Sequence, residues 1–188
     1  MKISSKITAL LCAWMSIGHA AVSEKIYTNH YFVRPSQGQT LQEAVYNSSP
    51  ISRDGKVYYG QTQWTVSPTF RYMTRGNLCY LSDIEIQLKV KFMLPKLHLD
   101  HPEPDIESRF ERFYRALQVH EIGHQALGQE AAQTIADKLD NMVPHYDCEQ
   151  LANIAKSHVA ETIKHYKQRN SDYDQETQFG KTQGAVIR

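Results

Sequence analysis

The sequence predicts an α+β fold, with strands and one short helix in the N-terminal half and two long helices after them. The clearest strand is "DIEIQLKVKFMLP", where apolar residues from Ile84 to Phe92 alternate with charged or amide residues. A period of two is typical of a strand with one buried face. Between residue 108 and Pro144 apolar residues instead recur every three or four positions, and a second such series follows Asp147. That spacing predicts two amphipathic helices.

The first residues predict export. Lys2 and Lys6 precede the apolar run "ITALLCAWMSIG", and the small residues Gly18 and Ala20 close the segment. This arrangement is typical of a signal peptide cleaved near Ala20. The run has about a dozen residues, too few to span a bilayer as a helix, so a retained membrane anchor is the weaker alternative. We therefore expect residues 1–20 to be removed and residues 21–188 to form a single periplasmic or secreted domain.

The charge of that domain is close to balanced. Residues 1–20 contain two lysines and no acidic residue, which leaves 19 Lys and Arg against 20 Asp and Glu, a formal charge of −1. A protein that binds nucleic acid through its phosphates carries an excess of Lys and Arg. The composition therefore argues against a nucleic-acid partner.

Two cysteines, Cys79 and Cys148, remain after cleavage. Export to an oxidising compartment favours a disulfide between them, and two buried free thiols are the alternative. A bridge over about 70 residues would stabilise the fold by roughly 4 kcal/mol on the chain-entropy model.

The N-terminal half predicts an antiparallel or mixed sheet with a short helix. Thr40 and Glu43 have the spacing of a capping box, so a helix should begin near residue 41. Residues 57–73 are rich in aromatic and β-branched side chains and predict a strand. The charged face of residues 84–92 is typical of an edge strand or a solvent-facing strand, and an edge strand there could pair with an extended substrate.

The C-terminal half predicts two helices and a loop. Ser108 and Glu111 have capping-box spacing at the start of the first helix, and Asp147 and Gln150 have it at the start of the second. The tail "NSDYDQETQFGKTQGAVIR" is typical of a loop. The apolar residues expected to face inward from the second helix are Leu151, Ile154, Val159 and Ile163.

The stretch "VHEIGHQALGQE" lies in the middle of the first long helix. His120 and His124 are one turn apart on the same face and continue the apolar stripe between Leu117 and Leu127, so both should be buried. Two buried imidazoles need partners for their nitrogen atoms, and a divalent metal supplies one. Glu121 lies about 100° further round the helix, beside such a metal, where it can accept a proton from water.

This pattern predicts zinc-dependent hydrolysis of an amide bond. Zinc with an open coordination position lowers the pKa of a water molecule to about 7 and polarises a carbonyl oxygen, while the glutamate acts as the base. A peptide, a protein or a cell-wall amide would each suit that chemistry. Alternatives are two hydrogen-bonded core histidines, or a metal-binding or interaction protein with weak or no activity. Gly123 and Gly128 in the same helix predict either close approach of another group or simple tolerance.

A catalytic zinc needs a third protein ligand, and the spacing alone leaves it open. Glu130 is at the position used after a glycine bend, but Leu127 replaces that glycine, so Glu130 should point away. Further candidates of suitable chemistry are His158, Glu161 and His165 in the second helix, and His98 and His101, which we expect to be solvated.

Nearly the whole mature chain resembles a family of bacterial predicted secreted zinc-dependent proteases that is catalogued as a domain of unknown function. The resemblance lies in the order and spacing of "YFVRPSQGQTLQEAV", "GQTQWTVSPTFRY", "CYLSDIEIQLKVKFMLP", "HEIGH" and "YDQETQFGKTQGA". It implies a zincin-like α+β fold with His120 and His124 as zinc ligands and Glu121 as the general base.

The tail of the family resembles the pattern Tyr-Asp-x-x-Thr-x-His-Gly, whose histidine is a plausible third ligand. The chain matches it with Tyr173, Asp174, Thr177 and Gly180 but has Phe179 where the histidine should be. Asp174 is our choice of third ligand; a water ligand or an inactive relative are the alternatives. Tyr173 could stabilise an oxyanion or simply pack.

Overall fold

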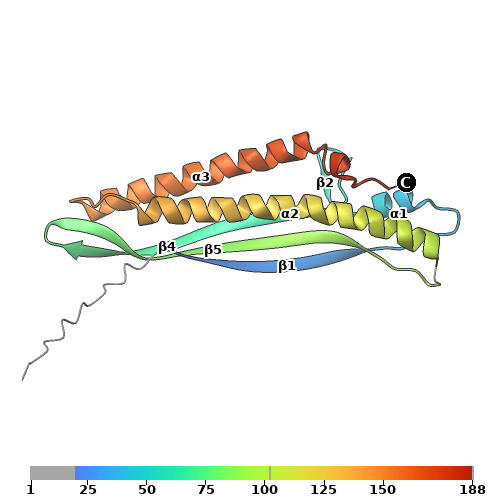
Figure 1. The fold of residues 1–188 in the computed structure, drawn as a ribbon, viewed down its shortest axis with the longest axis horizontal. Helices are drawn as coiled ribbons and strands as arrows, with labels where there is room; N and C mark the ends of the chain where they lie inside the picture. The colour runs from blue at the N-terminus through green and yellow to red at the C-terminus, as the bar shows by residue number, and fades with distance from the viewer. Residues whose placement is uncertain (1–19, 102, 188) are drawn as a thin grey trace, which may run out of the picture.

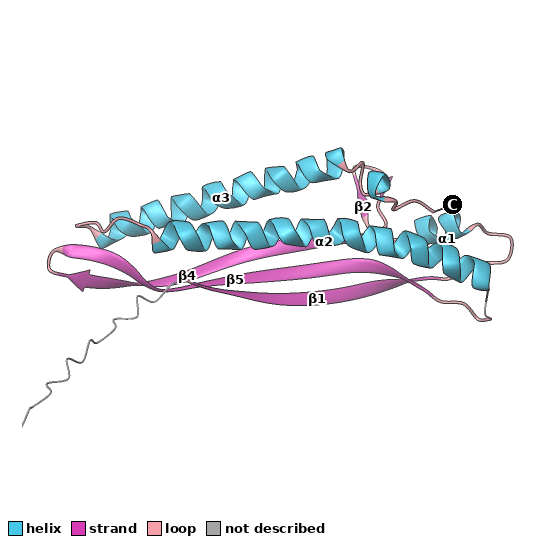
Figure 2. Cartoon of the chain, viewed as in Figure 1, coloured by secondary structure: helices cyan, strands magenta, loops and turns pink. Residues whose placement is uncertain are grey.

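The computed structural model describes residues 20–101 and 103–187. Residues 1–19, which carry the export prediction, lie outside this part. The described chain forms three layers: a sheet, a long helix α2 lying on it, and a second long helix α3 lying on α2 (Figure 1). Figure 2 shows the helices on one side of the sheet, with the other side uncovered. Within the described residues no helix is both long and apolar enough to cross a bilayer. The α+β class with a mixed sheet and two long helices is therefore confirmed.

The sheet has three strands in the order β1 (Ala21–Val33), β5 (Leu78–Leu97) and β4 (Gln61–Arg75). β1 runs parallel to β5, and β4 runs antiparallel to it. The alternation in β5 is confirmed, since its apolar side chains are buried and its charged ones exposed. However, β5 is the central strand, so the edge-strand interpretation is wrong, and the charged row faces solvent. The residues of β1 up to His30 are exposed, which is why no alternating pattern marked that strand.

The strand expected over residues 57–73 is divided in two. β3 (Lys56–Val57) pairs with β2 (Ser52–Arg53) in a small hairpin, and β4 begins only at Gln61. The Tyr59 carbonyl in the intervening segment accepts a hydrogen bond of 2.8 Å from the Tyr31 hydroxyl of β1. This bond ties the break in the strand to the core.

Helix α1 (Leu41–Ser48) begins as predicted. The Thr40 hydroxyl accepts from the Glu43 amide, and the Glu43 carboxylate accepts from the Thr40 amide, which completes the capping box. α1 buries Leu41, Ala44 and Val45.

Helix α2 spans Pro104–Asp140 and begins earlier than predicted. Pro104 is in the first turn, where its missing N–H costs nothing, and Glu103 precedes it without a side-chain cap. The capping box predicted at Ser108 is wrong, because the Ser108 hydroxyl accepts from Arg112 at 2.8 Å instead.

Helix α3 spans Cys148–Glu176. Its predicted start is confirmed, since the Asp147 side chain accepts from the amides of Glu149 and Gln150. The loop predicted from Asn170 is wrong, because α3 continues to Glu176 before a turn and the short 3-10 helix η1 (Lys181–Gln183). Ile154 is also not buried as predicted, with 39% of its surface exposed.

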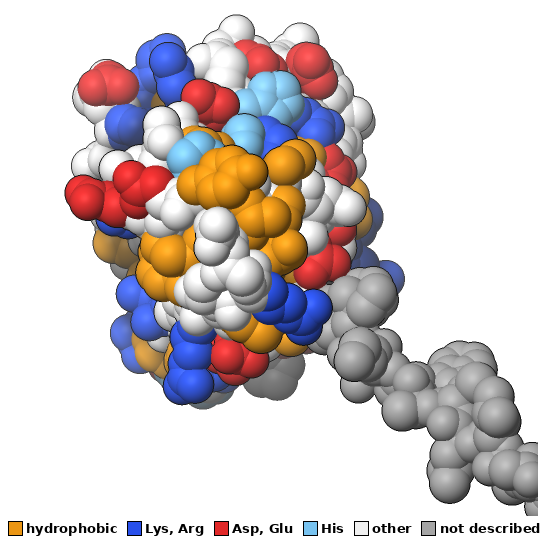
Figure 3. Space-filling model, turned by 90° about the vertical axis from the view of Figure 1, so that its left-hand side faces the viewer, with side chains coloured by type: hydrophobic (Ala, Val, Ile, Leu, Met, Phe, Trp, Pro, Cys, Tyr) orange, Lys and Arg blue, Asp and Glu red, His pale blue; other side chains and the backbone are white. Residues whose placement is uncertain are grey.

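The Cys79–Cys148 disulfide joins the start of β5 to the first residue of α3, with the two Cα atoms 5.4 Å apart. The predicted pairing is therefore confirmed. The Cys79 and His145 backbones exchange two hydrogen bonds beside it. Hydrophobic side chains gather on this end of the molecule (Figure 3). The exposed ones here are Tyr72 and Met73 near the end of β4, and Val143 and Tyr146 in the α2–α3 connection.

Candidate metal site

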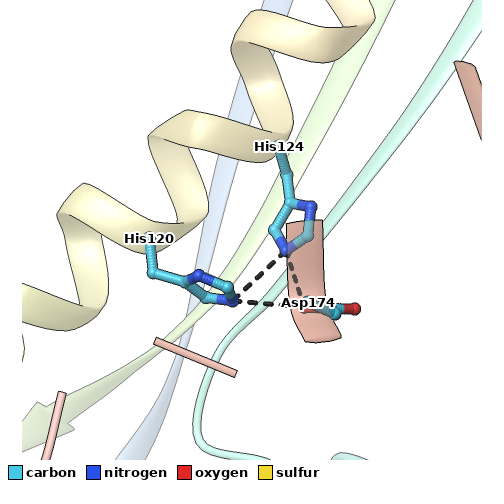
Figure 4. Close-up of side chains that lie close together, drawn as sticks. All are labelled: His120, His124 and Asp174. Atoms are coloured by element: carbon cyan, nitrogen blue, oxygen red, sulfur yellow. Dashed lines mark hydrogen bonds and ion pairs between the residues drawn. The ribbon is translucent and has the colours of Figure 1, made fainter. Parts of the chain in front are cut away.

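Three predicted ligands meet between the middle of α2 and the last turns of α3. Asp174 Oδ1 lies 3.3 Å from His120 Nε2 and 3.1 Å from His124 Nε2, and the two Nε2 atoms are 3.3 Å apart (Figure 4). Both histidines are buried, with 3% and 5% of their surface exposed. Ligand atoms of a tetrahedral site with bonds of 2.0–2.1 Å are separated by about 3.3–3.4 Å. The triangle of atoms therefore has the size that such a metal requires.

The proton of His124 is placed by a chain of hydrogen bonds. Trp64 Nε1, which can only donate, donates to Asn170 Oδ1 at 3.2 Å, so that atom is an acceptor. His124 Nδ1 lies 2.9 Å from the same oxygen. His124 Nδ1 must therefore carry a hydrogen, which leaves Nε2 with a free lone pair.

The proton of His120 is placed in the same way. The Thr177 hydroxyl donates to the Tyr173 carbonyl at 2.6 Å, so its oxygen is free to accept from His120 Nδ1 at 3.3 Å. The Gln183 amide nitrogen donates to the Tyr173 hydroxyl, and its oxygen lies 3.1 Å from His120 Nδ1. His120 Nδ1 therefore also carries the hydrogen.

Both Nε2 lone pairs consequently point at each other and at a carboxylate oxygen. Three acceptors at this distance, largely removed from water, repel one another unless a cation lies among them. Metal-binding histidines in proteins donate their other ring N–H to a carbonyl or carboxylate oxygen, as both do here. The donor set therefore fits a divalent metal.

The arrangement of the cluster shifts the pKa values of Asp174 and His124 in opposite directions. Burial raises the pKa of Asp174, but hydrogen bonds and charge from His120 and His124 outweigh it and hold the pKa well below its usual range. Burial lowers the pKa of His124, but Asp174 and Glu121 outweigh it, so the pKa is raised. The metal-free cluster thus favours an added proton, which a metal would replace.

Glu121 lines the same cavity as the cluster and is 3% exposed. Its Oε2 accepts a hydrogen bond of 2.6 Å from the Thr62 hydroxyl of β4. Burial raises the pKa of Glu121 above the usual value, and the Thr62 bond opposes this rise. Gly60 makes room for the carboxylate, because a Cβ there would lie 2.4 Å from Glu121 Oε1.

Tyr173 supports the ring of His120. The two rings stack with centroids 5.2 Å apart, and the Tyr173 ring meets His124 edge-on at 5.0 Å. A Cβ at Gly123 would lie 2.1 Å from the Tyr173 hydroxyl, so this glycine permits close approach of a side chain. The Tyr173 hydroxyl is directed at α2 and accepts a hydrogen bond from Gln183. Tyr173 therefore packs against the site, and its hydroxyl is not directed at an oxyanion.

A model of the family described as "Bacterial protein of unknown function (DUF922)" matches residues 28–180. The chain belongs to this family. No curated protein and no solved structure matches it. The DUF922 match covers the last part of β1, all of α1, β4, β5, α2 and α3, and therefore the whole cluster.

The other ligand candidates of the DUF922 chain lie outside the cluster. Glu130 forms an ion pair with Arg169 on the exposed surface. His98 is paired loosely with Asp100, and His165 packs against Tyr166. The remaining candidates, which are also absent from the cluster, are His101, His158 and Glu161.

Phe179, where the resemblance led us to expect a histidine, lines the cavity and packs against Tyr58 with centroids 5.2 Å apart. Gln178 and Phe179 both have a left-handed backbone, with φ of 50° and 56°. This turn brings Thr177 and Gln183 to His120, while Asp174 supplies the third potential ligand atom. The cluster therefore has three candidate ligands without a histidine at position 179.

Sequence reasoning missed the hydrogen bonds that fix the two imidazoles, from Asn170, Thr177 and Gln183. It also missed Thr62, which holds Glu121. Asn170 is four residues before Asp174 and so shares its face of α3. The four-residue spacing of Asn170 and Asp174 would have indicated this only if residues 170–176 had been predicted as helix. The contacts of Thr62 depend on strand pairing and have no local signature.

Proposed function

We propose that the protein is a zinc-dependent hydrolase of amide bonds, a periplasmic or secreted metallopeptidase with a zincin-like site. The observation that carries the proposal is the convergence of two histidine lone pairs and one carboxylate oxygen, each Nε2 atom 3.1–3.3 Å from Asp174 Oδ1, with both Nδ1–H groups already bonded. His120, His124 and Asp174 would hold the metal. When bound, zinc supplies Lewis acidity toward a carbonyl oxygen and lowers the pKa of water.

Glu121 provides the base. Its carboxylate faces the cavity beside the cluster, is shielded from bulk water, and has a raised pKa, which suits a group that takes a proton and later returns it. Thr62 holds one oxygen of the carboxylate, so the other is available for the proton of an attacking water molecule. The same group can then protonate the leaving nitrogen of the cleaved amide.

Substrate reaches the site through a cavity of about 720 Å³, within the usual range for ligand pockets. The prediction that an extended substrate pairs with residues 84–92 is wrong, because β5 already pairs with β1 along one edge and with β4 along the other. Gly60 and the start of β4, residues 61–63, line the cavity. Among the described residues β4 has β5 as its only strand partner. A peptide would therefore lie along β4.

The test is Glu121→Gln, which keeps the shape of the side chain and removes the base. We expect the protein to keep about one zinc ion per chain while hydrolysis of an unfolded protein substrate or of cell-wall fragments falls by at least about a hundredfold. Metal analysis and a fluorescence assay measure the two quantities. Glu130→Gln, on the exposed part of the same helix, is the matched control and should hydrolyse like the parent.

Two results would contradict the proposal. Equal hydrolysis by the parent and Glu121→Gln would remove the catalytic claim and favour a metal-binding protein without turnover. Iron in place of zinc would point instead to the chemistry of two histidines and one carboxylate in iron oxygenases.

A further inference from the structure

Three cationic side chains line the mouth of the cavity. Arg53 and Lys56 come from the β2–β3 hairpin, and Lys181 comes from η1. All three are exposed, whereas the two carboxylates in the lining, Glu121 and Asp174, are buried or nearly so. Segments distant in sequence thus bring positive charge to one opening.

Arg53 is held close to the reacting centre. Its guanidinium lies over the Tyr58 ring, 5.1 Å from the centroid, and Nη2 is 3.9 Å from Asp174 Oδ2. That separation exceeds a hydrogen bond, and the side chain is 62% exposed. Within the described residues the guanidinium has no hydrogen-bond acceptor. Its donors are therefore available to an incoming group.

With a divalent metal bound, the charged groups that line the cavity would have a net positive charge. A divalent cation is balanced by Asp174 and Glu121, which leaves the charges of Arg53, Lys56 and Lys181 facing the cavity. Neither lysine side chain has an ion pair or hydrogen bond in the part of the chain that the structure describes. An anionic group entering the cavity would meet these three cations without displacing a protein partner from the lysines.

The wall beside these cations is aromatic. Tyr58 contacts both Arg53 and Phe179, and Tyr46 and Tyr59 also line the cavity. Aromatic and apolar walls bind side chains, while a few charged groups fix the orientation. A guanidinium binds a carboxylate with two parallel hydrogen bonds, which defines that orientation closely.

We infer that the preferred substrates carry a free carboxylate within a residue or two of the scissile amide, bound by Arg53 with support from Lys56 and Lys181. The inference rests on the proposed function and adds the substrate class. The carboxylate is either the C-terminal group of a peptide or an acidic side chain. Both present the same two oxygens to Arg53.

Binding can be measured without turnover by using the zinc-loaded Glu121→Gln protein. Calorimetry compares a short aromatic peptide ending in a free carboxylate with the same peptide as its C-terminal amide, and a second pair in which Glu replaces Gln next to the scissile bond. We expect one acidic member to bind about ten- to hundredfold more tightly than its neutral partner, as for hydrogen bonds to charged groups. The pair that shows the difference identifies the source of the carboxylate.

Adding Arg53→Gln should remove most of that difference while zinc content stays the same. In the active parent, Arg53→Gln should raise KM for the acidic peptide at least about tenfold more than KM for the neutral peptide. Lys91→Gln, on the exposed opposite face of the sheet, is the charge-matched control and should change neither.

Two outcomes would overturn the inference. One is equal affinity of acidic and neutral peptides. The other is an equal loss for both peptides in Arg53→Gln, which would make Arg53 a support for Asp174 instead. Absence of hydrolysis by the parent would count against the proposed function alone, because the binding comparison does not depend on turnover.

Discussion

The interface between α2 and α3 changes character along its length. At the disulfide end, next to the α2–α3 connection, the helices share an apolar core that includes Ile135, Leu139 and Ala155. At the metal end, around His120 and Asp174, they meet through buried polar groups. Apolar contacts are non-directional and tolerate small shifts, whereas each group at the metal end depends on a named hydrogen-bond partner. The first end holds the helices together, and the second orients side chains.

The two ends are far enough apart to be separated by experiment. At 1.5 Å per residue, His124 lies about 24 Å along the helix from Asp140, the last residue of α2. The predictions below change one end at a time, from the largest expected effect to the smallest.

Replacing both Cys79 and Cys148 by Ser should lower the free energy of unfolding by roughly 4 kcal/mol, because the bridge closes a loop of 69 residues. Chemical denaturation measures this loss. Zinc affinity of the folded variant should stay within about threefold of the parent, since the bridge lies at the disulfide end. A large fall in zinc affinity would show that the two ends are coupled.

Asp174→Ala removes one of three candidate ligands from the metal end. Structural zinc sites with four ligands bind with about 10–16 kcal/mol, so losing one ligand should cost about 3–4 kcal/mol, several hundredfold in affinity. Competition with a zinc chelator measures it. Asp172→Ala, two residues earlier on α3 and bonded to Gln168, is the control. A variant that binds zinc as tightly as the parent would refute Asp174 as a ligand.

Asn170→Leu tests whether the outer hydrogen bonds orient the site. It removes the acceptor of both His124 Nδ1–H and Trp64 Nε1–H, so the hydrogen on His124 is free to move to Nε2 and block the metal. We expect a ten- to hundredfold loss of zinc affinity. NMR of the imidazole nitrogens reports the tautomer. The control is Asn153→Leu, on the exposed part of α3 near the disulfide end, which should leave the zinc affinity and the His124 tautomer unchanged. An unchanged tautomer in Asn170→Leu would argue against Asn170 as the residue that orients His124.

The sequence predicted the elements whose signals are local. The capping box at Thr40, the cap at Asp147 and the alternation in β5 each depend on residues within one turn or one strand, and all three are present. The two histidines of α2 also follow from the helical period alone. Such features are largely independent of what the rest of the chain does.

The errors arose where distant contacts outweigh local preference. Residues 170–174, Asn-Ser-Asp-Tyr-Asp, have low helix propensity, yet they are helical where Tyr173 stacks on His120 and Asn170 bonds Trp64 and His124. The position of β5 at the centre of the sheet depends on its pairing with β1, a strand whose exposed pattern gave no signal.

The sequence by itself determined which residue types could bind a metal and that two of them share a buried face of one helix. The family resemblance suggested Asp174 among several candidates, but only the tertiary structure brought it to the two histidines and set the direction of every lone pair. Asp174 lies 50 residues beyond His124. The hydrogen-bond partners of Glu121, His124 and His120 come from β4, α3 and η1. A hydrogen bond requires a definite distance and angle between two atoms, so the orientation of the site exists only once these segments are packed together.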